Sequence, residues 1–441
     1  MTGAYGMIHV QSDIGRKQGD ACDSITGLGV PRWLSRVCTT VEEGGVFPVS
    51  DVTVETSKPP IDIAAGIPDP TQLAYRQIRQ AISQVLGDKA RAFSALSYGD
   101  PLGERSLREW VAGFRNVDVD SVIITNGAME AIFLSAIATL DPGDTVIVEH
   151  RSFPQAARIF SRLGMRLRSV PLTPQGVDIE VLNRLLESQR VDGNRIKAIY
   201  TIPNFQNPTG ISASADTKRK LLELAEHHGI AVIADDPYHD LWFSQPPAEF
   251  PGEYRGTSGS PLLEIGSFSK WLGPGLRVGW LIADSAAVRK IAGYRLGVDG
   301  GPATLTQYAL SQVLQGSWGN QWLAAERRFY AEKAKALLET LQCRLGEEID
   351  VLPPQGGYFL WARLPEWFNS SAASVRRALA IQGINPVWGN VFTPPSEIDV
   401  GQPDDDARHC MRLSFAHVSK NRLEQVADRL RDALDEVRPS H

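Results

Sequence analysis

The most informative stretch of this sequence is LLEIGSFSKWLGPGLRVGW, residues 262–280. It begins as an apolar run typical of a buried strand, and the run ends in a serine followed by Lys270. Most lysines extend along a surface into water, so a lysine at the edge of a buried strand is unusual. Ser267 before it, and a glycine-rich turn with Arg277 after it, are residues that can hold a phosphate group closely. The stretch therefore indicates a polar site at the end of a buried strand.

Further apolar, β-branched runs recur on both sides of this stretch. Helical segments such as MEAIFLSAIATL (129–140) and ADTKRKLLELAEHH (215–228) separate several of them. Near-continuous apolar strands that alternate with helices predict a mostly parallel sheet covered on both faces, an α/β fold. The predicted strands are 121–125, 144–150, 196–202, 230–236, 262–269 and 278–284.

The pattern changes after about residue 303. A long helical region is expected over 304–345, and the strands GYFLWARL (357–364) and MRLSFA (411–416) and a helix over 420–436 follow it. This order predicts a second, smaller α+β domain. The predicted parts are an N-terminal arm, partly disordered, over 1–60; a large domain over 61–303, whose residues 61–95 begin the small domain; and the small C-terminal domain over 304–441.

Composition narrows the class of protein. The chain has 441 residues, 43% of them hydrophobic, which is enough for two domains. A net charge of −6 gives no basic excess for nucleic acid or a membrane surface. We see neither a signal peptide nor an apolar run of the roughly 20 residues that a membrane helix needs. The four scattered cysteines have no metal-ligand spacing, so we expect a cytoplasmic protein without a metal site.

Polar residues also stand at the ends of other predicted strands, where ligands bind in open α/β sheets. Asp235 ends the run IAVIAD, and a buried carboxylate there needs a cationic partner, although Asp beside Pro is often only a turn former. Gly127 in TNGAMEAI opens a helix whose N–H groups can bind an anion. Asn207 follows another strand in PNFQNPTG. Each feature alone is equally compatible with an ordinary turn.

Together, these segments resemble one family. SFSKWLGPGLRVGW (267–280) resembles the lysine signature of the class I/II aminotransferases, which are fold-type I pyridoxal-phosphate enzymes. The resemblance runs from about residue 60 to the C-terminus and is closest to the 2-aminoadipate and kynurenine aminotransferase branch. It implies the aspartate-aminotransferase fold, the cofactor pyridoxal 5′-phosphate and a homodimer. The companion motifs, in the family's order, are YGDPLGERSLREW (98–110), TNGAMEAI (125–132), PNFQNPTG (203–210) and ADDPYHDL (234–241).

The resemblance also implies a role for each matching residue around the cofactor ring. Lys270 would carry the cofactor as a Schiff base and move the substrate's proton. Asp235 would keep the ring nitrogen protonated, so that the ring withdraws electrons. Asn207 and Tyr238 would hydrogen-bond the ring's phenolic oxygen, and Phe153 would stack on the ring.

Other residues would hold the phosphate and the substrate. Arg412, in MRLSFA, would clamp the α-carboxylate of an amino acid or 2-oxo acid, with Gly66 and Asn207 beside it. Tyr98 would reach the phosphate bound by the neighbouring subunit. The phosphate ligands within the same chain would be Ser267, Arg277 and the turn Gly127, Ala128 and Met129.

Some positions depart from the family pattern. The loop HRSF (150–153) replaces the commoner proline-serine/threonine-tyrosine pattern, and Trp388 stands where a proline-glycine pair usually begins. Trp388 would either reshape the substrate pocket or pack within the small domain. We therefore expect an aminotransferase, with elimination, replacement or cyclisation on the same scaffold as the alternative. A ligand-sensing transcription regulator is disfavoured, because residues 1–60 are too short for a winged-helix domain and show no basic helix-turn-helix pattern.

Overall fold

The computed structural model describes residues 58–192, 195–395 and 405–439. All of these residues belong to one compact unit. The predicted arm over 1–60 lies almost wholly outside the described residues, so the prediction of partial disorder is not tested. Among the residues described, no helix is both long enough and apolar enough to span a membrane.

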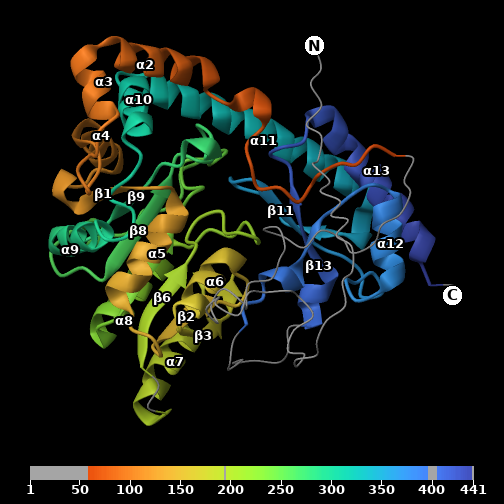
Figure 1. Cartoon of the computed structure of the whole chain (residues 1–441). Coiled ribbons are helices and arrows are strands. Elements are labelled where there is room, and N and C mark those ends of the chain that lie inside the picture. Colours follow the sequence, from red (N-terminus) through yellow and green to blue (C-terminus); the bar gives the residue numbers. More distant parts are fainter. Residues whose placement is uncertain (1–57, 193–194, 396–404, 440–441) are drawn as a thin grey trace, which may run out of the picture. The chain divides into compact units, whose positions relative to one another are not determined.

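The central feature is a seven-stranded sheet with the strand order β1-β9-β8-β7-β6-β2-β3 (Figure 1). Strands β3, β2, β6, β7 and β8 pair in parallel, and β9 runs antiparallel to both of its neighbours. The prediction of a mostly parallel sheet is therefore confirmed. The strands are β1 (Val122–Thr125), β2 (Thr145–Glu149), β3 (Arg166–Val170), β6 (Ile196–Thr201), β7 (Ala231–Asp235), β8 (Leu262–Ser267) and β9 (Gly279–Ile282).

Helices cover both faces of this sheet, because alternate side chains of each strand point to opposite sides. Val146 and Val148 pack toward α5 (Ala128–Thr139), α6 (Pro154–Arg162) and α9 (Ser285–Arg295). Ile147, between them, packs toward α7 (Ile179–Asp192) and α8 (Ala215–His228). Local signals set the helix ends: the Ser214 hydroxyl caps α8, and Gly229, in the left-handed conformation, ends it. The carboxyl ends of the parallel strands therefore meet at one edge of a rigid layer.

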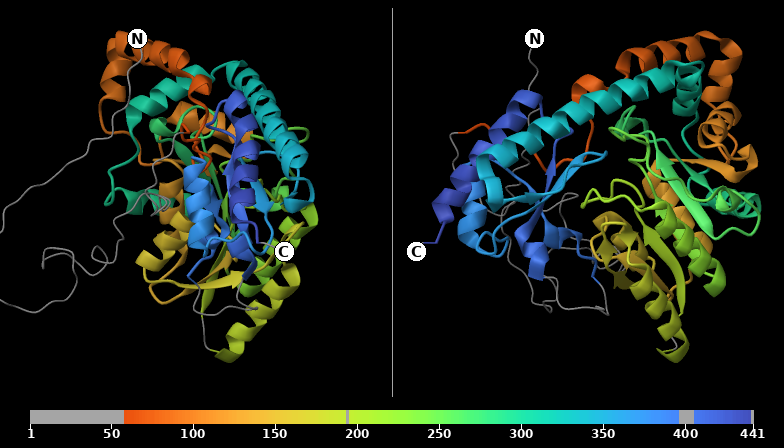
Figure 2. Two further views of the ribbon diagram at one scale, coloured as in Figure 1. Left: turned by 90° about the vertical axis from the view of Figure 1, so that its right-hand side faces the viewer. Right: turned by 180° about the vertical axis from the view of Figure 1, so that it is seen from behind.

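The C-terminal part contains a four-stranded antiparallel sheet with the order β10-β11-β13-β12. Its strands are β10 (Asp350–Val351), β11 (Phe359–Arg363), β12 (Val387–Trp388) and β13 (Cys410–Ser414). The helices of this part are α11 (Trp318–Leu345), α12 (Ala373–Ile381) and α13 (Lys420–Val437), and α13 packs against both of the others. The right-hand view of Figure 2 shows the long helix α11 running from the region of α10 toward α13.

The predicted helical region over 304–345 is not continuous. Helix α10 (Thr304–Leu314) ends before Gly316, which has a φ of 71°, and α11 begins at Trp318. A positive φ is left-handed backbone that breaks a right-handed helix, and glycine adopts it readily. The earlier helices α2 (Tyr75–Gly87), α3 (Lys89–Ala95) and α4 (Arg105–Arg115) pack against α10.

The first described residues lie against the four-stranded sheet. Ile61 forms a parallel bridge with Ile384, and the Ile63 carbonyl oxygen accepts a hydrogen bond of 2.7 Å from the Ser414 N–H. The following segment carries Gly66 toward the edge of the other sheet, where its carbonyl oxygen meets Lys270. This segment therefore joins the two sheets next to the predicted site.

Candidate active site

A pocket of about 170 Å³ lies at the carboxyl ends of the parallel strands of the seven-stranded sheet. Asp235 is the last residue of β7, Ser267 ends β8 and Phe153 follows β2. The pocket brings together most of the side chains that the sequence analysis selected. Its lining consists of Ala128, Met129, Ile132, Phe153, Ile202, Asn207, Asp235, Pro237, Tyr238, Ser267, Ser269, Lys270, Pro274 and Arg277.

Lys270 lies in the turn after β8, with its ammonium group inside the protein. Its Nζ donates a hydrogen bond of 2.8 Å to the Gly66 carbonyl oxygen and lies 5.3 Å from the centre of the Tyr238 ring. Burial, together with the positive charge of Arg412, lowers the pKa of Lys270 to about 8. A lysine with such a pKa is partly neutral near physiological pH. It can therefore attack a carbonyl group or accept a proton.

Asp235 presents a carboxylate with an unused oxygen to the same pocket. The Tyr200 hydroxyl donates a hydrogen bond of 2.7 Å to Oδ2, whereas Oδ1 is buried and has no hydrogen-bond partner among the described residues. Burial raises the pKa of Asp235 to about 7, although the Tyr200 hydrogen bond opposes the shift. A cationic group bound beside Oδ1 would satisfy this oxygen and favour its charged form.

An anion-binding cradle lies beside the start of α5. Gly127 has a φ of 80° and precedes the helix, so that the Ala128 and Met129 amides belong to the first turn. Helix N-termini of this length attract anions through their N–H groups and dipole. Arg277 reaches the same place, since its Nη2 donates 3.1 Å to the Asn126 carbonyl oxygen. A Cβ atom on Gly127 would approach that guanidinium to 2.8 Å and displace it, and the positive φ itself favours glycine.

Arg412 lies on β13 and reaches across to the pocket from the four-stranded sheet. Its Nη1 donates 2.7 Å to the Asn207 Oδ1, and its Nη2 donates 2.6 Å to the Ala64 carbonyl oxygen. The guanidinium lies 3.9 Å from the centre of the Phe359 ring, and burial lowers its pKa to about 10. A Cβ atom on Gly66 would lie 2.8 Å from the Phe359 ring, so a larger residue there would displace this ring. A cation held in this way can bind a carboxylate with two hydrogen bonds.

Two positions singled out in the sequence, Tyr98 and Trp388, lie outside the lining of this pocket. Tyr98 is 95% exposed and does not line the pocket within this chain. Trp388 is half-buried and packs 6.2 Å from the Phe368 ring, which is the small-domain packing offered as one of its two interpretations.

Sequence reasoning missed three supporting residues. Tyr200, whose hydroxyl holds Asp235, stands in the apolar run IKAIYT, and its position near the strand end was the available signal. Glu149 ends β2 and accepts hydrogen bonds from the Ile202 N–H and the Gln206 side chain, which fixes the loop that carries Asn207. The Tyr358 hydroxyl donates to the Lys270 carbonyl oxygen. Nothing in the local sequence pairs Tyr358 with Lys270.

The pocket fits pyridoxal 5′-phosphate group by group. The α5 cradle and Arg277 suit a phosphate, the unused Asp235 oxygen suits a protonated ring nitrogen, and Lys270 suits an aldehyde carbon. These complementary groups converge on one space, which supports the cofactor that the sequence resemblance implies.

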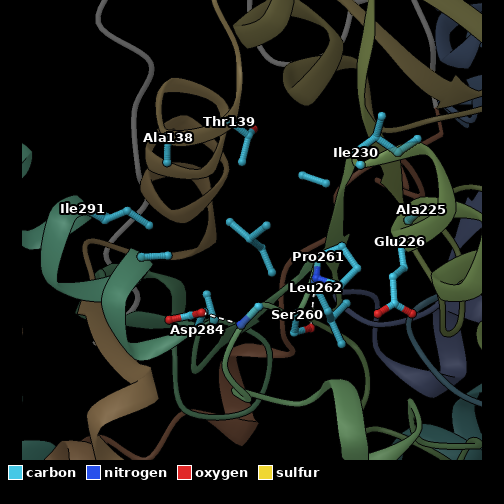
Figure 3. Close-up of a pocket in the computed structure, with 16 residues that line it drawn as sticks. Ala138, Thr139, Ala225, Glu226, Ile230, Ser260, Pro261, Leu262, Asp284 and Ile291 are labelled. Atoms are coloured by element: carbon cyan, nitrogen blue, oxygen red, sulfur yellow. Dashed lines mark hydrogen bonds between the residues drawn. The ribbon is translucent and has the colours of Figure 1, made fainter.

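A second hollow, of about 320 Å³, lies at the opposite edge of the same sheet (Figure 3). Its lining is mainly apolar and comes from the ends of α5 and α8 and the start of β8, with Glu226 and Asp284 as the acidic members. Asp284 already accepts the Ala286 N–H at 2.6 Å as the cap of α9. None of the predicted site residues lies there, so the chemistry belongs to the Lys270 pocket.

Comparison with known proteins gives a consistent assignment. The sequence profile of the family "Aminotransferase class I and II" matches residues 59–430. The aromatic-amino-acid aminotransferase 1 of Thermococcus litoralis is 28% identical and aligns with 87% of this chain and 89% of its own length. The 2-aminoadipate transaminase of Thermus thermophilus is 30% identical over 86% of this chain and 91% of its own. The crystal structure of Pyrococcus horikoshii kynurenine aminotransferase in complex with PMP superposes with a TM-score of 0.77 at 28% identity, covering 87% and 93% of the two chains.

Proposed function

The chain belongs to the class I and II aminotransferases and has their fold-type I architecture, and on that premise we propose the roles of its pocket residues. It is a pyridoxal-phosphate-dependent enzyme that exchanges an amino group between an amino acid and a 2-oxo acid. The observation that carries the proposal is the convergence of Lys270, the unused oxygen of Asp235 and the anion cradle of α5 in one pocket.

Lys270 holds the cofactor and transfers the substrate proton. When bound, the cofactor supplies a ring that accepts the electrons left at the substrate Cα. Asp235 holds the positive charge at the ring nitrogen, and Asn207 and Tyr238 orient the phenolic oxygen. Phe153 would stack on the ring. Their common position at the pocket supports these roles.

The phosphate end of the cofactor would bind at the start of α5. Ser267, Arg277, Gly127 and the amides of Ala128 and Met129 bind it, and the positive-φ turn at Gly127 supports this assignment. The substrate α-carboxylate binds Arg412, with Asn207 and Gly66 beside it. Two hydrogen bonds to a planar guanidinium fix the carboxylate, which directs the Cα–H bond toward Lys270.

The direct test is a two-step exchange followed in the visible spectrum. Single L-amino acids are added to the cofactor-loaded protein, the amino acid is removed, and a 2-oxo acid is then added. An aminotransferase gives one equivalent of 2-oxo acid in the first step and recovers its original spectrum in the second. Release of ammonia, or a product in which an added nucleophile has replaced a side-chain group without any need for a 2-oxo acid, would instead support elimination or replacement chemistry.

Replacing Arg412 by alanine is expected to raise the KM for the amino acid by about 10- to 100-fold, because a charge-assisted pair of hydrogen bonds to the carboxylate is lost. The dissociation constant of the cofactor should change by less than about threefold. Steady-state kinetics and a cofactor titration measure both quantities. Arg429→Ala is the matched control, since Arg429 is a buried arginine on α13 that donates to the Gln382 carbonyl oxygen. Equal losses of substrate and cofactor binding in the Arg412 variant would assign it a structural role.

We further propose that the enzyme is a homodimer in which Tyr98 completes the neighbouring subunit's phosphate site. Phe93, Leu96 and Tyr98 are 76%, 70% and 95% exposed, although large apolar side chains in one short segment are normally covered. Thr304 ties this segment down by donating to the Ala95 carbonyl oxygen at 2.8 Å. The apolar side chains are therefore presented by a fixed backbone, which suits a permanent interface.

Changing both Phe93 and Leu96 to aspartate is expected to convert the dimer to a monomer at micromolar concentration, because the buried charges would lack partners. Light scattering coupled to size-exclusion chromatography measures the mass. Cofactor affinity should fall by about tenfold as the partner's tyrosine is lost. Leu352→Asp is the control, because Leu352 is also exposed but lies in the loop after β10. A fully active monomeric wild type would contradict the proposal.

Two wider expectations stay proposals. The large domain covers 61–303, with 61–95 beginning the small domain, and the small domain covers 304–441. The bridge of Ile61 to Ile384 and the hydrogen bond from the Ser414 N–H on β13 to the Ile63 carbonyl oxygen support the shared start. We also propose a cytoplasmic location. The exposed free thiol of Cys343 suits a reducing compartment.

A further inference from the structure

The loop HRSF (150–153) joins β2 to α6, and Arg151 is one of its departures from the family pattern. The backbone of this loop is held on both sides. The Arg151 carbonyl oxygen accepts 2.6 Å from the Gln206 side chain, next to Asn207 in sequence. The Ser152 N–H donates 2.9 Å to the Phe392 carbonyl oxygen, which belongs to the C-terminal part. The loop therefore already touches both halves of the active site.

The Arg151 side chain makes its described contacts with the four-stranded sheet and its surroundings. The guanidinium lies 5.2 Å from the centre of the Trp361 ring on β11. Its Nη1 is 3.8 Å from the Cys410 sulfur on β13, and its Nη2 is 3.6 Å from the Asp406 Oδ2. Only 7% of the residue is exposed. An arginine whose backbone follows β2 thus ends in the other sheet.

These contacts lie directly beside the substrate carboxylate site. Trp361 is the register partner of Arg412, and Cys410 stands two residues before Arg412, so its side chain points to the same face of β13. The Phe392 ring lies 5.0 Å from the Arg412 guanidinium and 6.1 Å from the Trp361 ring, on which Arg151 stacks. The contacts of Arg151 with this strand therefore also affect the position of Arg412.

We propose that Arg151 is a positioning residue for transamination: it fastens the loop that carries Phe153 to the strand that carries Arg412. This inference rests on the roles proposed for Phe153 and Arg412. The Arg151 contacts set the distance between Phe153, which stacks on the cofactor, and Arg412, which binds the substrate carboxylate. Small changes in that distance weaken substrate binding, because the substrate must contact the cofactor and Arg412 at the same time.

The positive charges of Arg151 and Arg412 explain why the Arg151 contacts include an ion pair. Arg151 and Arg412 present two positive charges over one sheet face, which would repel each other without a counter-charge. Asp406 supplies it, and the Arg363 Nε also donates to Asp406, at 2.6 Å. Burial raises the pKa of Asp406, but the hydrogen bond and charge of Arg363, with the charge of Arg151, outweigh this and lower it. Asp406 is therefore ionised at neutral pH, and a planar guanidinium can both pair with it and stack on Trp361.

The test replaces Arg151 by methionine, an unbranched apolar side chain that removes the charge. Binding of an α-methyl amino acid, which has no Cα–H bond to break, is measured by titration of the cofactor-loaded protein. Its dissociation constant is expected to rise about tenfold, and the affinity for the cofactor to change less than twofold. The turnover number at saturating substrate should change less than about threefold, since the reacting groups remain.

A second pair of variants and a matched control separate this role from general destabilisation. Asp406→Asn should reproduce part of the loss, and Asp406→Asn combined with Arg151→Met should bind no more weakly than Arg151→Met alone. Arg438→Met is the control, because Arg438 also lies over a tryptophan, 5.5 Å from the Trp367 ring, and pairs with Glu348 at 2.6 Å. Its affinity for the analogue should be unchanged.

The outcomes are distinct. Unchanged analogue binding in Arg151→Met, or losses of analogue and cofactor binding in equal measure, would overturn the positioning role. Absence of amino-group exchange by the wild type would instead count against the proposed function. Analogue binding still reports on Arg151 in that case, because the measurement does not depend on turnover.

Discussion

Lys270→Ala is expected to lower the turnover number by about 10⁴-fold, the largest effect of any single substitution in the pocket. The variant loses the amine that holds the cofactor and also the base that receives the Cα proton. Among the residues described as lining the pocket, Lys270 is the one lysine, and burial and Arg412 lower its pKa to about 8. Rapid-quench measurement of 2-oxo acid formation gives the residual rate.

Cofactor binding should survive in this variant, although it becomes reversible. The cradle at α5 and Arg277 does not involve the lysine, so dialysis should remove the cofactor from Lys270→Ala but not from the wild type. Lys270→Arg restores a positive charge but not a group that can lose its proton near neutral pH, so it should be equally inactive. Turnover within tenfold of the wild type in either variant would refute the assignment of Lys270.

Many of the residues selected from the sequence line one pocket because they stand at or just after strand ends. Asp235 and Lys270 each interrupt an apolar run, and the parallel strands that precede them must end at the same edge of the sheet. The fold class follows from the same alternation of strands and helices, and the structural comparisons confirm it. By contrast, β3 was not predicted, since its sequence RLRSV carries two arginines and a serine that break the apolar pattern.

Contacts between distant segments were out of reach of pattern reasoning. Arg412 and Asn207 are 205 residues apart, and only the packing of the two sheets brings the guanidinium 2.7 Å from the amide oxygen. Arg151 illustrates the same limit. The sequence shows that Arg151 lies in a loop that departs from the family pattern. Its stacking on Trp361, however, depends on how β11 lies against the loop after β2. Such pairs require the assembled structure.

The pocket holds an acidic and a basic group, Asp235 and Lys270, whose pKa values are shifted toward each other. Burial raises the pKa of Asp235 and lowers that of Lys270, so both groups approach neutrality from opposite directions. Each is costly to hold charged in the absence of a ligand. A ligand with a cationic nitrogen and an aldehyde would satisfy both, which makes the site more stable when loaded than when empty.

Asp235→Asn is therefore expected to lower kcat/KM by about 10³-fold and yet to stabilise the cofactor-free protein at pH 8. Burial raises the pKa of this carboxyl from 3.8 to about 7, so between those values the folded chain binds a proton that the unfolded chain has released. The free energy of unfolding falls as pH rises through this interval, because the folded state holds more protons. Asparagine is uncharged throughout, keeps an oxygen for the Tyr200 hydroxyl, and removes this loss.

Calorimetry of the cofactor-free proteins at pH 5 and pH 8 measures the difference. The variant should exceed the wild type by about 2 kcal/mol at pH 8, and the gap should narrow at pH 5, where the wild-type carboxyl is protonated. With the cofactor bound the order should reverse, since the wild type alone offers a negative charge to the ring nitrogen and gains the larger stabilisation on binding. If the variant were less stable than the wild type at pH 8 without cofactor, Asp235 would have to be paired with a cation in the empty site. That result would contradict its proposed role as the partner of the ring nitrogen.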